Sequence, residues 1–338
     1  MSTIKNNINT YADLTAYNND LNKDFPNVSY IEGTDEVKWN KYDPDHIVCV
    51  YNVTSTESAT KLLQVNNSIT YQIIDGVRQD TVQMNYTFDT LGEHIVKYKM
   101  NVTYINTQTL FYMCPNLVSA VIPETITRIE STALFYSCSN LTNVVLPKTL
   151  TFIGDRVFEY CSKLTTISIP NGVTEIRKCF GNSGLTYIDL PNSVTTLKST
   201  FNTAQSLKRV NSNVDGECNI PNSVTSIGGD TFGQSTGLTS INIPDSVTTI
   251  GNGAFSSNSN LRQITIGSGI TSIGNQATVN SVNIQSITIK ATTPPTISEL
   301  TWQTSTCPIY VPSQSVESYK TTGNWVTYAD RIQAIPTT

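Results

Sequence analysis

Seven cysteines and two histidines carry the most reactive side chains of this 338-residue chain. Cys114, Cys138 and Cys161 recur at nearly equal steps, and a column of thiolates could bind a metal ion or form disulfides. In later copies of the pattern small residues take the same position, namely Asn182, Ala204, Ser235 and Asn258. A position that accepts small residues is typical of a tight buried turn, so we predict structural cysteines and no metal site.

Few residues of the repeats could act as a general acid or a general base. His46 and His94 both precede the repeats, so a Ser-His-Asp or Cys-His arrangement within the repeats would lack its general base. A glycosidase needs two opposed carboxylates in a cleft. The candidate carboxylates in the repeats are scattered and show no recurrent pairing; they are Asp189, Asp215, Glu217, Asp230 and Asp245. We therefore predict a protein that is not an enzyme and uses no cofactor.

The composition and charge of the chain limit the classes of partner that it can bind. Charged residues make up 14 % of the chain and the net charge is −5, while residues 103–290 carry 11 Lys/Arg and 10 Asp/Glu. A nucleic-acid surface needs clustered basic residues, so we expect no nucleic-acid partner. No apolar run approaches the length of a membrane span, and the first residues lack the apolar core of a signal peptide. We expect a chain without membrane insertion or an export address.

A sequence repeat positions all of these side chains. In each copy, a segment such as Leu238–Pro244 predicts a strand that ends at a proline. The following segment, such as Val247–Ile250, predicts a second, shorter strand. Gly251 then allows a tight turn, and a phenylalanine precedes the next copy. Seven copies are anchored at Pro123, Pro147, Pro170, Pro191, Pro221, Pro244 and Gly267. A period of this length indicates a solenoid, because each unit must stack on its neighbours to bury its apolar face.

Within each unit the phenylalanine should point into a continuous core. On the first strand, side chains alternate between core and solvent. The predicted outward, ligand-binding residues are Asn143, Thr166, Tyr187, Arg209, Ser240 and Gln263. This mixed surface suits a glycan or a polar protein epitope, with Tyr187 as a stacking platform. A solvated sheet face without a ligand is the competing interpretation.

One copy is longer than the others by seven residues, and the extra length lies in the segment 208–219 before Pro221. An insertion in a repeat protein becomes a loop on one face, often the binding face. A loop without any partner is the equally open alternative.

The array resembles the BspA-type leucine-rich repeat family, and residues 232–255 keep its pattern best. Residues 309–332 resemble the tail that closes such arrays. The resemblance implies a display or adhesion protein. The segment from Tyr11 to Ser29 is similar to the opening segment of structural proteins of phages that infect gut bacteria, which implies docking to a phage particle.

Together these patterns predict a mostly β chain with four parts. They are an N-terminal docking segment (1–45), an immunoglobulin-like β domain (46–102), the leucine-rich-repeat solenoid (103–290) and a C-terminal cap (291–338). In the first part, Tyr11, Leu14 and Leu21 share one side of a short helix, through which the chain would dock to virion proteins.

We predict a phage virion protein, a head or tail fibre on the virion surface, that binds bacterial surface glycan or protein. By analogy with other fibres it could form a homotrimer. The alternative is a bacterial cell-surface adhesin that binds host matrix proteins. A carbohydrate-active enzyme is a third reading, which requires two close carboxylates in one pocket.

Overall fold

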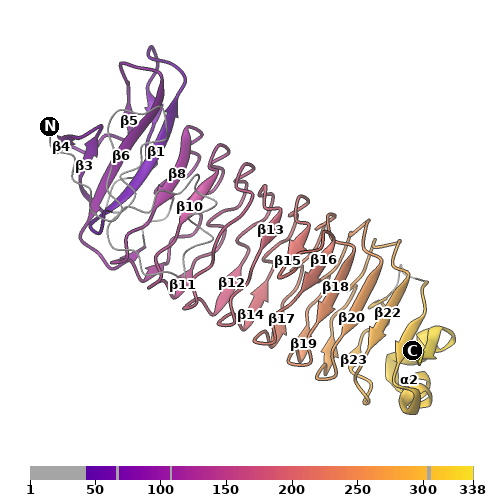
Figure 1. Ribbon diagram of the computed structural model, residues 1–338. Coiled ribbons are helices and arrows are strands. Elements are labelled where there is room, and N and C mark those ends of the chain that lie inside the picture. The colour runs from indigo at the N-terminus through magenta and orange to yellow at the C-terminus, as the bar shows by residue number, and fades with distance from the viewer. Residues whose placement is uncertain (1–42, 66–67, 107–108, 303–305, 338) are drawn as a thin grey trace.

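The computed structural model describes residues 43–65, 68–106, 109–302 and 306–337. It is an elongated β-solenoid of about 10 turns, with its N-terminal strands at one end and its helical cap at the other (Figure 1). The predicted fold class, a mostly β chain with a repeat solenoid, is confirmed. The solenoid has more turns than the seven copies predicted from the sequence. An additional turn, which contains Ser286–Ile289, lacks the proline or glycine that marks a copy but continues the stack.

The N-terminal strands and the first repeats share one sheet. β1 pairs antiparallel with β6 on one side and with β8 on the other, and β8 pairs parallel with β10. The strand order is β10-β8-β1-β6-β3-β4, and β2 pairs with β5 in a second small sheet. The bounds are β1 His46–Val53, β2 Thr60–Lys61, β3 Ile69–Ile74, β4 Val77–Gln79, β5 Asn85–Tyr86, β6 Gly92–Met100, β8 Leu117–Val121 and β10 Asn143–Val145.

The immunoglobulin-like arrangement of residues 46–102 stays a prediction, but one of its hairpins is wrong. The alternation over Val82–Phe88 predicts a strand that pairs with residues 94–100. In the structure both edges of β6 are already taken by β1 and β3, so β5 covers only Asn85–Tyr86 and pairs with β2.

In the repeats, the first strands and the second strands form two separate parallel sheets. The first-strand sheet consists of β13 Tyr187–Ile188, β15 Arg209–Val210, β16 Glu217–Asn219, β18 Ser240–Ile243, β20 Gln263–Ile266, β22 Ser286–Ile289, β24 Ile309–Val311 and β25 Ile332–Ala334. The second-strand sheet consists of β12 Glu175–Arg177, β14 Thr196–Lys198, β17 Ser226–Ile227, β19 Thr249–Ile250, β21 Ser272–Ile273 and β23 Thr296–Ile297. A three-stranded sheet of β7 Tyr104–Ile105, β9 Arg128–Ile129 and β11 Phe152–Ile153 precedes the latter.

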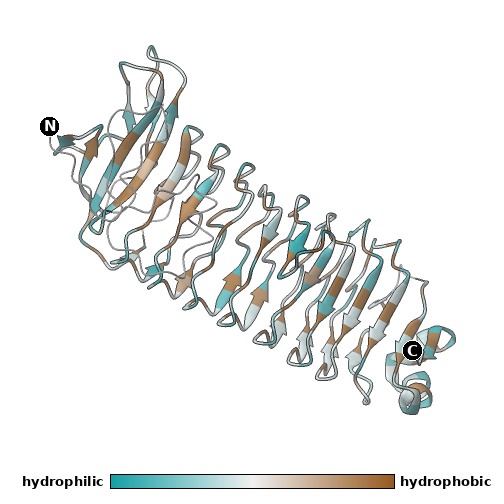
Figure 2. Ribbon diagram, viewed as in Figure 1, coloured by the Kyte–Doolittle hydropathy of each residue, from teal (hydrophilic) through white to brown (hydrophobic). Residues whose placement is uncertain are grey.

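A column of stacked phenylalanines runs through the core. Neighbouring ring centroids are 5.3 to 6.0 Å apart, and the rings are within 25° of parallel. All seven rings are fully buried: Phe111, Phe135, Phe158, Phe180, Phe201, Phe232 and Phe255. The prediction that these phenylalanines point into the core is therefore confirmed, and Figure 2 shows the apolar segments repeating from strand to strand.

The turn around each phenylalanine has a fixed backbone shape. The residues two before and two after it have positive φ, as at Arg156 (59°) and Tyr160 (61°) around Phe158. Non-glycine residues pay for this conformation, so other contacts must hold it. Backbone hydrogen bonds between units do so, because the amide of Phe135 donates to Val157 and that of Ser137 donates to Glu159.

A helical cap covers the last turn. It contains η1 Ser313–Ser315, α2 Val316–Thr321 and η2 Gly323–Arg331. Tyr319 and Trp325 are buried, and their polar atoms donate to the backbone oxygens of Ala291 at 2.9 Å and Pro295 at 2.7 Å. Among the described residues, no helix combines the length and apolarity that a bilayer crossing requires.

Gly251 is needed for close approach rather than for an unusual turn. Its φ is not positive, and a Cβ there would lie less than 3.0 Å from the backbone of Gly228 and Gly229 in the preceding unit. At Gly229 itself, the nearest atom to a Cβ would be the oxygen of Asn252 at 3.1 Å.

We expect Gly251→Ala to lower the free energy of unfolding by about 1–3 kcal/mol, because the added methyl group forces two turns apart. Urea denaturation followed by circular dichroism measures this difference. The matched control, Gly229→Ala, should cost clearly less. Equal midpoints for Gly251→Ala and the wild type would show that the units are not stacked this closely.

Candidate binding surface

The outward face of the first-strand sheet carries two rows of polar side chains, which we call the polar face. The register aligns Glu217, Ser240, Gln263 and Ser286 in one row and Asn219, Asn242, Thr265 and Thr288 in the other. All eight are half-buried or exposed, whereas Ile241, Ile264 and Ile287 between them are fully buried. The strand alternation thus produces regular rows of hydroxyl and amide groups with one carboxylate.

Four of the six predicted ligand-binding residues lie in this sheet. Tyr187 is aligned with Arg209, and Ser240 with Gln263. The two pairs are not continuous, because β16 lies between them and places Glu217 beside Ser240.

The other two predicted residues lie elsewhere. Thr166 is half-buried in a segment without a strand. Asn143 is only 6 % exposed in β10, where its strand partner Ser119 is also buried, so it offers almost nothing to a ligand. The predicted docking residues Tyr11, Leu14 and Leu21 fall outside the described residues.

The inserted segment 208–219 forms an additional strand as well as a loop. β15 and β16 both lie between β13 and β18 in the first-strand sheet, whereas β14 pairs directly with β17 in the other sheet. The short loop between β15 and β16 ends at Gly216, whose φ is +92° and whose amide donates to the Lys208 oxygen at 2.8 Å. A Cβ at Gly216 would collide with the side chain of Thr239, so this turn requires glycine.

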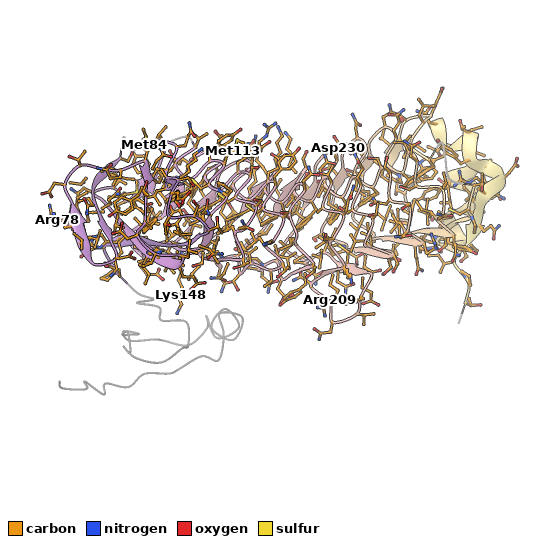
Figure 3. The ribbon with its side chains drawn as sticks, turned by 90° about the horizontal axis from the view of Figure 1, so that it is seen from above. Arg78, Met84, Met113, Lys148, Arg209 and Asp230 are labelled. Carbon is orange, nitrogen blue, oxygen red and sulfur yellow. The ribbon has the colours of Figure 1, made fainter. Side chains whose placement is uncertain are left out.

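A polar cluster lies at the additional strand. The Arg209 guanidinium is 5.2 Å from the centroid of the Tyr187 ring, and its Nε is 3.2 Å from Asp215 Oδ1. The Tyr187 hydroxyl donates to Asp189 Oδ2 at 2.7 Å. Partial burial and Asp189 raise the pKa of Tyr187 to about 12, so the phenol is protonated at neutral pH. Figure 3 shows Arg209 at one edge of the molecule.

The carboxylates of this cluster are all engaged with neighbouring side chains. Asp189 accepts from Tyr187, Asp215 pairs with Arg209, and Glu217 accepts a hydrogen bond from Ser212 at 2.8 Å. Each carboxylate in it therefore already has a partner, whereas a general base must be available to the substrate.

Sequence reasoning missed several residues of this surface. The side-chain amide of Asn211 bonds both backbone groups of Leu190, at 3.1 and 3.0 Å, and so fixes the start of the inserted loop. Asn219 and Asn242 are joined by a side-chain hydrogen bond of 2.7 Å. Continuing the strand alternation by two residues would have predicted the second row, but nothing local in the sequence indicates the bond made by Asn211.

The cysteine column is explained by hydrogen bonds to the phenylalanine column. Cys138 Sγ donates to the backbone oxygen of Phe111 at 2.9 Å, and Cys161 Sγ to that of Phe135 at 3.1 Å. In later units other small donors make the same bond: Ser235 to Phe201, Asn258 to Phe232 and Ser281 to Phe255. The position thus requires a small side chain, and most units place a donor there, whereas Ala204 fills it without one.

One assignment in this column needs correction. In the unit of Phe180, the position belongs to Ser183, which is buried, and not to Asn182, which is half-buried and has a φ of 51°. The register shifts because this copy is short, so the turn rather than the residue count fixes the alignment. In the described part of the chain, no three His, Cys, Asp or Glu side chains are grouped to hold a metal ion.

Comparison with known proteins supports the repeat assignment. A family model for the BspA type leucine rich repeat region matches in six copies, over residues 81–208 and 177–306. A leucine-rich repeat protein of T. pallidum is 27 % identical, with 49 % of this chain and 78 % of that chain covered and a TM-score of 0.42. A leucine-rich repeat protein of Bacteroides ovatus is 19 % identical, with 73 % and 78 % covered and a TM-score of 0.35.

A third solved structure, a leucine rich cell surface protein of Faecalibacterium prausnitzii, is 21 % identical, with 71 % of this chain and 89 % of that chain covered and a TM-score of 0.30. Among curated proteins, none matches this chain.

All seven cysteines are buried, and we expect their thiols to be inert in the folded protein. Burial raises the pKa of Cys138 to about 12 and holds the pKa of Cys161 well above its ordinary value, so neither is a thiolate at pH 8. Reaction with a chromogenic disulfide reagent should be slow without denaturant and should reach all seven thiols in guanidinium. A thiol that reacts at once in the native protein would contradict this burial.

Proposed function

We propose that this chain, which belongs to the BspA-type leucine-rich repeat family, is a non-enzymatic binding protein of a bacterial surface. Its ligand would be a polar surface polymer, either a glycan or a protein. The observation that carries the proposal is the polar face, whose two rows repeat the same kinds of hydrogen-bonding group from strand to strand.

Regular rows favour an extended ligand. Each additional strand offers a further hydroxyl or amide pair at the strand spacing, roughly 4.8 Å. A single such contact contributes little, but several along one ligand add up. The core fixes the backbone of every row, so little conformational entropy is lost on binding.

Electrostatics favours a ligand that is neutral or weakly charged. Arg209 is already paired with Asp215, and from Ser240 to Thr288 the polar face carries only hydroxyl and amide groups. A basic or acidic polymer would therefore find little charge to pair with on these strands.

Two arguments support a role without catalysis. The carboxylates of the Tyr187–Arg209 cluster are engaged with neighbours, and the two histidines lie in or beside the N-terminal sheet, in β1 and β6. His94 contacts Asp75 at 2.6 Å and the Thr90 oxygen at 2.9 Å, and His46 contacts Asp43 at 2.7 Å. Both histidines thus have structural partners.

Of the two predicted locations, we favour the bacterial cell surface, where proteins of this family are commonly found. Host matrix proteins are then candidate ligands. The phage-fibre prediction draws its distinguishing argument from the resemblance of the segment from Tyr11 to Ser29, which lies outside the described residues, and the homotrimer is an analogy with other fibres.

Replacing Ser240 and Gln263 together by alanine should weaken binding by about 10-fold, because two aligned hydrogen-bonding groups are lost. Binding of the purified chain to immobilised bacterial polysaccharide, fibronectin and fibrinogen provides the measurement. Thr296→Ala, an exposed change on β23, is the control and should bind like the wild type. Unchanged binding by the double variant, or turnover of a polysaccharide, would rule out this function for the polar face.

Immunogold labelling of the producing cells and of any particles they release distinguishes the two locations. We expect label on the cell envelope, since the family is one of bacterial surfaces. Label confined to phage particles would instead establish the fibre prediction.

A further inference from the structure

A second surface lies on the turns of the first three units, away from the polar face. We call it the tyrosine stripe and define it as Tyr112, Met113, Tyr136 and Tyr160. Tyr112 and Tyr136 directly follow the buried Phe111 and Phe135, and Met113 and Tyr160 occupy the next position in their turns. In Figure 3, Met113 and Arg209 lie at opposite edges of the molecule, so the stripe and the Tyr187–Arg209 cluster are separate surfaces.

The three rings form a continuous aromatic row along the solenoid axis. Tyr112 and Tyr136 are stacked, with centroids 5.0 Å apart and planes 7° from parallel. Tyr160 continues the row at 5.2 Å from Tyr136, with its plane turned by 63°. Tyr160 and Met113 are 42 % and 49 % exposed, whereas the two stacked rings are half-buried. The row is therefore ordered by its own contacts before any ligand arrives.

The hydroxyl groups of the row are available. Within the described residues, no hydrogen bond engages the phenols of Tyr112, Tyr136 or Tyr160, although tyrosines elsewhere in the chain bond to protein atoms. Burial and the nearby Glu159 raise the pKa of Tyr136, so its hydroxyl is a neutral donor. Glu159 is itself paired with Arg156 at 3.5 Å, so the charges beside the stripe cancel.

The fold does not require these aromatic residues. Later units carry Gly181, Asn202, Gly233 and Ser256 at the position of Tyr136, and Asn182, Thr203, Gln234 and Ser257 at that of Tyr160. Tyr160 (φ 61°) and Met113 (φ 52°) also have left-handed backbone conformations, which are costly for bulky side chains. Large exposed side chains that are both dispensable and strained call for an explanation other than packing.

We propose that the tyrosine stripe is a binding site for a neutral, linear saccharide that lies along the solenoid axis. The electron-rich faces and free hydroxyls of tyrosine match the C–H faces and hydroxyls of a sugar ring. The one-per-unit spacing of the rings offers successive contacts to a repeating chain. A stable protein partner would require about 800 Å² on each side, far more than four side chains provide.

Two substitutions test the site without changing the fold, because each installs a residue that the chain already uses at that position. Tyr136→Ser copies Ser256, and Tyr160→Asn copies Asn182 in a backbone conformation that asparagine tolerates well. The matched control is Tyr104→Thr, because Tyr104 is also 42 % exposed but lies on strand β7 rather than on the turns of the stripe. Urea midpoints of all variants confirm that they are folded.

The probes are hexasaccharides of a β-glucan, a xylan and chitin, with anionic hexagalacturonate for comparison, titrated calorimetrically into the full chain. We expect at least one neutral hexasaccharide to bind, and each stripe variant to lose about 10-fold in affinity. Tyr104→Thr and the Ser240→Ala/Gln263→Ala variant should bind it normally, which separates this site from the polar face.

Three outcomes of these titrations would overturn the proposal. They are no binding of any neutral hexasaccharide at millimolar concentration, binding of hexagalacturonate alone, and stripe variants that bind as the wild type does. A cell-surface ligand that depends on the stripe but is destroyed by protease and resists periodate would point to a protein and would also refute a saccharide site.

Discussion

The stacking of each turn on the next is the constraint on which this structure depends. A unit of about 23 residues cannot bury its own apolar face, so its phenylalanine is covered only when a neighbour supplies another ring. The seven-ring column and the cross-unit backbone bonds both require one register. That register also aligns the residues of the polar face, where the side-chain hydrogen bond between Asn219 and Asn242 adds to it.

The ends of the stack obey the same constraint in different ways. At the N-terminal end β1 runs antiparallel to β8 and continues the sheet into β6 and β3, so the first turn has a paired neighbour. At the C-terminal end Trp325 and Tyr319 cover the last turn and donate to backbone oxygens. Both solutions avoid an exposed, unpaired edge beside the core.

Regular features of the chain could be predicted from sequence, and local exceptions could not. The repeat period predicted the solenoid and the burial of Phe158, Phe232 and Phe255, because one physical requirement recurs in every copy. The strand formed by residues 217–219 was missed, because its pairing with β15 depends on the turn at Gly216 and not on the repeated sequence motif. Asn143 was expected at the surface because strand alternation places its side chain on the outer face. Alternation does not predict whether other residues cover that face, and in the structure Asn143 is buried. For the binding surface, strand alternation found single residues, whereas the pairing of Tyr187, Arg209 and Asp215 arises only from the fold.

The main-chain bonds between turns have a consequence for how such a chain can change over generations. Amide and carbonyl groups hold one turn to the next, as between Phe135 and Val157, and recurring side chains repeat the joint, as where the Thr248 hydroxyl donates to the Thr225 oxygen and that of Thr271 to the Thr248 oxygen. A gene duplication that adds a whole turn therefore gives the new turn a compatible neighbour on each side. Deletion of a whole turn likewise leaves two neighbours that can stack on each other. Recognition and architecture can thus evolve at different rates within a single polypeptide.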